Sequence, residues 1–146
     1  MTTLTGGCQC ARVRFTVDTV STGVELCHCS MCRRAVGNIY MSSLSVPKAA
    51  VRWEGSPATY ASSPIARRGF CGRCGTPLYF AYNEGAAMDL MVGAIDQAAA
   101  LTPARHFGVE SRLEAFGQLE GLREERTQDS AEIAQRWEDA GGRPGA

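Results

Sequence analysis

Seven cysteines in three tight groups are the residues of this sequence whose types and spacing favour chemistry. The groups are Cys8 and Cys10 in "GGCQC", Cys27, Cys29 and Cys32 in "CHCSMC", and Cys71 and Cys74 in "CGRCG". Thiols that only fill a core need no such grouping, whereas CxC, CxCxxC and CxxC spacings present several thiolates to one ion. The spacing predicts a metal-binding protein, with zinc as the metal and an iron–sulfur cluster as the alternative.

The number of cysteines limits how they can be divided between two metal sites. Seven ligands cannot fill two closed four-cysteine sites, but they can fill one and leave a second site with three. A zinc with three protein ligands keeps an open position for chemistry. Spacing alone leaves a second partition open, because Cys29, Cys32, Cys71 and Cys74 also read as the CxxC…CxxC pattern of a zinc ribbon.

Composition limits the classes of protein. A chain of 146 residues with 45% hydrophobic content fits one domain with a core. Its 15 basic residues balance 15 acidic ones without a basic and aromatic cluster, so nucleic acid is not an expected partner. The start "MTTLTGG" lacks a signal pattern, and Asp89 and Asp96 interrupt the most apolar stretch. The chain is therefore expected to be cytoplasmic, where its thiols stay reduced, and not to bind a membrane. A monomer or homodimer is expected.

Five segments together resemble a known family. "GGCQCARVRF", "CHCSMCRRAVG", "RRGFCGRCGTPLYF", "MVGAIDQ" and "RHFGVESRLEAF" are similar, in this order, to the glutathione-dependent formaldehyde-activating enzyme and centromere protein V family, over residues 4–118. The resemblance implies two zinc ions per chain. It implies that Cys8, Cys10, Cys71 and Cys74 hold a structural zinc, and that Cys27, Cys29 and Cys32 hold a second, catalytic zinc with an open position.

The activity implied by the resemblance joins glutathione and formaldehyde to give S-(hydroxymethyl)glutathione, and the reverse direction makes the enzyme a carbon–sulfur lyase. Its partners are therefore a small-molecule thiol and an aldehyde. Two alternatives remain open, a zinc-ribbon-like binding module without catalysis and a thiol redox sensor. The chain departs from the family pattern at Val36 and Asn38, and at Glu114 and Ala115, so the choice of thiol is not fixed by the resemblance.

Basic residues and histidines near the cysteines are the other candidates. Arg33 and Arg34 follow the second group and are candidate substrate-binding residues, because glutathione carries two carboxylates; a solvated basic turn is the alternative reading. Arg67 and Arg68 have the same two readings, the solvated basic turn is preferred for them, and they are excluded from the site. His28 is expected to support the second group rather than ligate metal, and His106 to be a hydrogen-bonded core residue, with proton transfer as the alternative.

The expected fold is mainly β, made of small irregular antiparallel sheets whose loops form zinc knuckles. Short alternating or β-branched stretches predict strands at "RVRFTV", "IYMSSLSV", "VRW", "LYFAY", "DLMVGAI" and "HFGV". Helical turns are expected at "SVPKAAV" and "IDQAAAL". A C-terminal helix is predicted with Asp129 as its cap and Gly141 as its end. We expect a zinc-binding domain over 1–120, with 121–146 as its helical extension and disordered tail.

Overall fold

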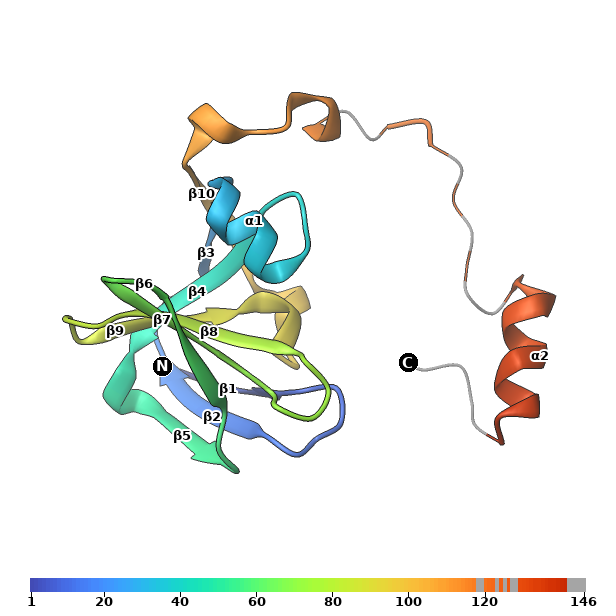
Figure 1. Ribbon diagram of the computed structural model, residues 1–146, viewed down its shortest axis with the longest axis horizontal. Helices are drawn as coiled ribbons and strands as arrows, with labels where there is room; N and C mark the ends of the chain where they lie inside the picture. Colours follow the sequence, from blue (N-terminus) through green and yellow to red (C-terminus); the bar gives the residue numbers. More distant parts are fainter. Residues whose placement is uncertain (118–119, 123, 125, 127–128, 142–146) are drawn as a thin grey trace. The chain divides into compact units, whose positions relative to one another are not determined.

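The computed structural model describes residues 1–117, 120–122, 124, 126 and 129–141 (Figure 1). The chain divides into two units, Met1–Leu113 and Glu114–Ala146. All seven cysteines belong to the first unit. The division at residues 120 and 121 stays a prediction, and residues 142–146 of the expected tail "GGRPGA" lie outside the described residues.

The larger sheet of the first unit has seven strands in the order β10, β3, β4, β9, β8, β7, β6 (Figure 1). The strands are β3 (Gly23–Cys27), β4 (Met41–Pro47), β6 (Ala58–Ser63), β7 (Ala66–Phe70), β8 (Pro77–Tyr82), β9 (Ala87–Met91) and β10 (Thr102–Phe107). Neighbours are antiparallel except β10 and β3, which are parallel. The fold is mainly β, as predicted, and each stretch predicted as a strand overlaps an observed one.

The smaller sheet has three antiparallel strands in the order β1, β2, β5. They are β1 (Thr2–Gly7), β2 (Arg14–Thr19) and β5 (Val51–Glu54). Gly6 bridges to Ile95, and a Cβ atom at Gly6 would lie 2.2 Å from the Ala94 carbonyl oxygen, so this close approach of two backbones requires glycine. The bridge fixes β1 against the segment that follows β9.

The hydrophobic core lies between the two sheets. Alternate residues of β2, such as Phe15 and Val17, are buried, because successive side chains of a strand point to opposite faces. They belong to the same buried cluster as Leu44 of β4 and Leu90 of β9. Burial of these apolar side chains stabilises each by about 1.5–3 kcal/mol relative to exposure. The core therefore holds the loops of both sheets in fixed positions.

A short helix, α1 (Ser30–Val36), follows β3 and contains part of the second cysteine group. Its seven residues are too few to show apolar periodicity, so the sequence did not predict it. Cys29 is its N-cap and Gly37, with φ of 63°, ends it. The described residues also form five short 3₁₀ turns. They are η1 (Lys48–Ala50), η2 (Val92–Ala94), η3 (Ala98–Ala100), η4 (Val109–Ser111) and η5 (Glu114–Gly117). The turns η1 and η3 confirm the two predicted helical turns.

The second unit contains the helix α2 (Ala131–Asp139). The predicted C-terminal helix is confirmed, but Asp129 is not its cap, because the Ser130 side chain accepts the hydrogen bond from the backbone N–H of Ile133. Gly141 has φ of 68° and donates its N–H to the Glu138 carbonyl, so the helix ends where predicted. In the part of the chain that the structure describes, no helix is long and apolar enough to cross a membrane.

Candidate metal centres and the adjoining cavity

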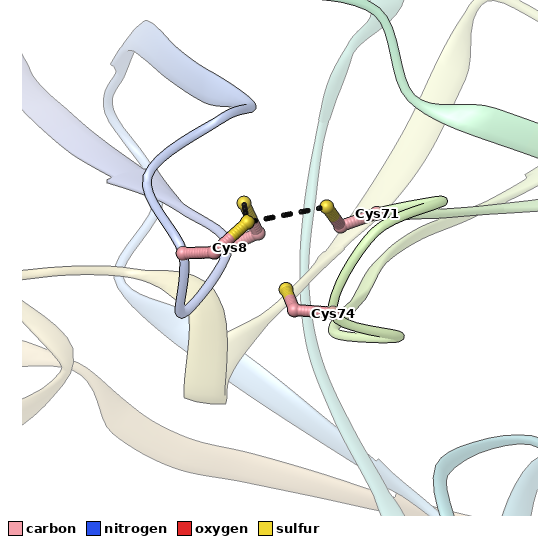
Figure 2. Close-up of side chains that lie close together, drawn as sticks. Cys8, Cys71 and Cys74 are labelled. Atoms are coloured by element: carbon pink, nitrogen blue, oxygen red, sulfur yellow. Dashed lines mark hydrogen bonds between the residues drawn. The ribbon is translucent and has the colours of Figure 1, made fainter.

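The first cluster of thiols, here the four-cysteine cluster, joins two loops that are distant in sequence. Cys8 and Cys10 lie in the loop after β1, and Cys71 and Cys74 lie in the loop between β7 and β8. Their four Sγ atoms lie within 4.8 Å of one another. Figure 2 shows the sulfur atoms of Cys8, Cys71 and Cys74 directed toward a common centre.

The spacing of these sulfurs suits a tetrahedral thiolate site. The Sγ of Cys10 lies 3.6 Å from that of Cys8 and 3.7 Å from that of Cys71. Zinc–sulfur bonds of about 2.3 Å in a tetrahedron place neighbouring sulfurs about 3.8 Å apart. The hydrogen bond with the Thr76 hydroxyl, at 3.2 Å, lowers the pKa of Cys74 to about 5. The donor set therefore fits a thiophilic divalent metal.

The second cluster, here the three-cysteine cluster, is built at a junction of strand and helix. Cys27 ends β3, Cys29 caps α1, and Cys32 lies in the first turn of α1. Their Sγ atoms also lie within 4.8 Å of one another. The backbone N–H of Cys32 donates to the Sγ of Cys29 at 3.3 Å, which suits a thiolate at the helix start. Burial raises the pKa of Cys27 to about 12, so a metal would be needed to hold this sulfur as a thiolate at neutral pH.

The two clusters are separate groups. The zinc-ribbon partition would need Cys29 and Cys32 to lie beside Cys71 and Cys74. In the structure Cys71 and Cys74 instead lie beside Cys8 and Cys10. The grouping therefore follows the four-plus-three division, and each group is a candidate metal centre.

Arg68 is a site residue that the sequence reasoning missed. Its Nη2 atom donates to the Sγ of Cys32 at 3.2 Å, and its Nη1 atom lies 3.2 Å from the Sδ of Met41. Its guanidinium also lies over the ring of Phe80, 4.8 Å from the ring centroid. Burial raises the pKa of Cys32, and the hydrogen bond from Arg68 opposes that rise. The alternation of side chains along β7 could have predicted this position of Arg68, since Ala66 and Arg68 face inward while Arg67 is exposed.

A cavity of about 820 Å³ adjoins the three-cysteine cluster, and all three of its cysteines line this cavity. Alternate residues of the larger sheet form much of the wall: Met41, Ser43 and Ser45 of β4, Ala87 and Asp89 of β9, and Ala66 and Arg68 of β7. Because alternate residues of a strand share a face, one face of the sheet lines the cavity while the other packs into the core. The size is that of a small-molecule site.

Arg33 and Arg34 lie elsewhere. They line a separate depression with Ser30, Gly37, Asn38 and Ile39, and neither lines the cavity beside the three-cysteine cluster. The Nε atom of Arg33 donates to the carbonyl oxygen of His28 at 3.2 Å, which ties α1 to the end of β3. Their binding to substrate stays a prediction.

The two histidines contact each other, with the Nε2 of His28 2.9 Å from the Nδ1 of His106. His28 is buried and also contacts the ring of Tyr40. His28 does not belong to the group of three sulfurs, as expected from strand alternation. The expectation that His106 is a core residue was wrong, because β10 is the exposed edge strand of the larger sheet.

The turn after β10 closes onto the three-cysteine cluster. Gly108 has φ of 64°, and a Cβ atom there would lie 3.0 Å from the backbone nitrogen of Cys29. The N–H of His28 donates to the carbonyl oxygen of Phe107 at 2.8 Å. The parallel pairing of β10 with β3 therefore positions a tight glycine turn against the N-cap of α1.

These features define a class of protein, a mainly β domain in which one thiol cluster joins two loops and a second thiol cluster faces a cavity. Residues 3–111 match the family described as glutathione-dependent formaldehyde-activating enzyme. The chain belongs to this family, which confirms the resemblance found in the sequence.

The chain is also similar to one curated protein and to one solved structure. An uncharacterized lyase of Schizosaccharomyces pombe is 35% identical over 80 residues, which are 55% of this chain and 58% of that protein. The match thus spans little more than half the length of this curated relative. A crystal structure of a Rhodobacter sphaeroides protein is similar with a TM-score of 0.58 and 19% identity, over 70% of this chain and 98% of that chain, which shows a shared fold.

Proposed function

We propose that the protein is a zinc-dependent carbon–sulfur lyase that acts on a thiol–aldehyde adduct, in the manner of an S-(hydroxymethyl)glutathione synthase. The observation that carries this proposal is the position of Cys27, Cys29 and Cys32 at the wall of the cavity. Family membership and the lyase name of the Schizosaccharomyces pombe relative support an enzyme of this type.

In this proposal each cluster binds one zinc ion. The four-cysteine cluster would be structural, since its four sulfurs fill a tetrahedron and join the loops of two sheets. The three-cysteine cluster would leave one position open. When bound there, zinc would supply a site at which the pKa of a substrate thiol falls, so that more thiolate is present at neutral pH.

The reaction joins the thiol sulfur to the carbonyl carbon of the aldehyde. The S–H bond and the π bond of the carbonyl group break, and a C–S bond and an O–H bond form, so that the proton ends on the former carbonyl oxygen. The lyase direction reverses each change. Cys27, Cys29 and Cys32 would hold the zinc ion at one side of the cavity and so fix where the thiol sulfur reacts. The walls would exclude water and align the aldehyde, which reduces the entropy lost when two reactants meet.

Arg68 would act on Cys32 rather than on the substrate. Its guanidinium is buried and already contacts Cys32, Met41 and Phe80. A fixed cation beside three thiolates offsets part of their negative charge and holds Cys32 in place. We therefore assign it as a positioning residue.

The cellular setting belongs to the same proposal. We infer that the protein works in the cytoplasm, where its seven cysteines, none of them in a disulfide, stay reduced, as a monomer or homodimer that uses small molecules. Light scattering on the reduced protein would decide between monomer and homodimer.

Metal content and turnover test the proposed function together. Protein purified under reducing conditions without chelator should contain about two zinc ions per chain by elemental analysis. Exchange between free and thiol-bound formaldehyde, followed by NMR, should be faster with the protein than without it. Cys32→Ser should remove this acceleration while the circular dichroism spectrum is retained.

Other results would redirect the proposal. An exchange rate equal to the spontaneous rate for every thiol and aldehyde tried, with both sites filled by zinc, would contradict the lyase assignment. About one zinc with three reactive thiols would instead favour a redox role for Cys27, Cys29 and Cys32. Iron in place of zinc would favour the iron–sulfur alternative.

A further inference from the structure

The charged groups around the cavity differ in whether another side chain of the protein already pairs with them. Among the described residues that line it, the charged side chains are those of Glu25, Arg68, Asp89 and Arg105. Each of the two arginines is already engaged. Arg68 contacts Cys32, Met41 and Phe80 as described above, and Arg105 forms an ion pair with Glu25.

Asp89 is the charged group of the cavity that forms no ion pair with another described residue. It lies at the middle of β9, between Ser45 of β4 and Phe80 of β8 in the register of the sheet. Burial has the largest effect on the pKa of Asp89 and raises it. The side chain of Ser45 and the charge of Arg105, which is paired with Glu25, lower this pKa only in part.

The rest of the wall is largely apolar. Met31, Met41, Ile65, Phe80, Tyr82 and Phe107 contribute to it. An anionic ligand would meet the carboxylate of Asp89 and the nearby thiols, with both arginines occupied. A ligand with an apolar body and one cation would instead cover these side chains and supply the charge that Asp89 lacks.

We propose that the cavity selects a thiol that carries an apolar body and a positively charged amine, and that the carboxylate of Asp89 binds the amine. This inference rests on the proposed function, since it names the thiol of that reaction. It makes Asp89 a specificity-determining residue. Glutathione carries one ammonium group but two carboxylates, so it would be a poorer substrate than a cationic thiol of similar size.

A matched set of thiols tests this selection. Three benzyl thiols that differ only in the para group, aminomethyl, methyl or carboxyl, would be compared with glutathione in the formaldehyde exchange assay. We expect kcat/KM to be about tenfold higher for the aminomethyl than for the carboxyl compound, because a charge-assisted hydrogen bond is formed in one case and a repulsion in the other.

Variants connect the selection to Asp89. Asp89→Asn should reduce the preference for the aminomethyl compound to less than about threefold. Glu84→Gln removes an exposed carboxylate from the turn between β8 and β9, which does not line the cavity, and should leave the preference unchanged. An equal or reversed preference in the wild type, or an unchanged preference in Asp89→Asn, would overturn the inference.

Binding without turnover separates this inference from the proposed function. The zinc-loaded protein would be titrated with para-methylbenzylamine and para-methylbenzoate, which lack a thiol, by ligand-observed NMR. Tighter binding of the amine that depends on Asp89, with no turnover of any thiol, would support the charge selection and contradict the lyase assignment. Equal binding of the two compounds, or binding of neither, would contradict the selection even if turnover is observed.

Discussion

The Nη2 atom of Arg68 lies 3.2 Å from the Sγ atom of Cys32, so a buried guanidinium donates a hydrogen bond to the three-cysteine cluster. Arg68 comes from β7 and Cys32 from α1, which are not neighbours in the sequence. The contact therefore couples the larger sheet to the candidate catalytic metal centre. It also places a fixed positive charge where the proposed site has an excess of negative charge.

Replacement of Arg68 by methionine should weaken metal binding at the three-cysteine cluster alone. Loss of a residue that hydrogen-bonds to a metal ligand reduces metal affinity or activity by about 10- to 100-fold. Zinc affinity would be measured by competition with a chromophoric chelator. Arg67→Met is the matched control, because Arg67 is an exposed neighbour that donates to the Thr59 hydroxyl. Equal effects of the two substitutions would argue against the assignment of Arg68.

Serine substitutions in the two clusters should have different effects. Cys32→Ser should lower the zinc content from about two ions to about one and leave a cooperative thermal transition. Cys71→Ser should abolish that transition or lower its midpoint strongly, because its cluster joins loops of both sheets. Elemental analysis and circular dichroism report the two quantities. If Cys32→Ser unfolds as readily as Cys71→Ser, the structural and catalytic roles are not divided as proposed.

Gly108→Ala should disturb the three-cysteine cluster more than its matched control. Gly108 and Gly37 have nearly the same backbone conformation, with φ and ψ of 64° and 37° and of 63° and 36°. Each substitution should therefore cost about 1 kcal/mol in unfolding free energy from backbone strain. A Cβ atom at Gly108 would additionally crowd Cys29, whereas one at Gly37 meets no atom within 4 Å.

Chemical denaturation and zinc titration measure these two effects of the glycine substitutions. Gly108→Ala should be the less stable variant and should lose zinc from the three-cysteine cluster at a lower chelator concentration. Identical stability and zinc retention in the two variants would show that the approach of Gly108 to Cys29 has no energetic consequence.

The stability difference between Asp89→Asn and the wild type should depend on pH. Burial raises the folded-state pKa of Asp89 above its ordinary value of 3.8, so ionised Asp89 destabilises the folded wild type. The native state then binds more protons than the unfolded state between these two pKa values, and wild-type stability falls as the pH rises through this window. Asparagine carries no such charge.

We therefore expect Asp89→Asn to have the higher midpoint of thermal unfolding at pH 7. The difference should shrink as the pH is lowered through the folded-state pKa of Asp89 toward 3.8. Both proteins keep the same cysteines, so loss of metal at low pH affects both and cancels in the difference. A difference of constant size from pH 7 to pH 4 would contradict a titration of Asp89.

Much of the local structure follows from the sequence. Strand stretches such as "LYFAY" and the turns η1 and η3 have local patterns, and the expected helix near the C-terminus has its own end signal at Gly141. The helix α1 was missed because it is short and carries Cys32, with Cys29 as its N-cap, rather than an apolar stripe. The cap of α2 differs by one position, from Asp129 to Ser130, since both residues have a suitable side chain.

By itself the sequence determined that thiols occur in three local groups, because CxC and CxxC spacings bring cysteines together through a single turn. Only the tertiary structure decided which groups share a centre, since Cys10 and Cys71 are 61 positions apart and meet through the packing of two sheets. It likewise decided that Arg68 rather than Arg67 faces Cys32 and that Asp89 faces the cavity. The direction of a side chain depends on strand register and on which face of the sheet is covered, and both are set by residues far away in the chain.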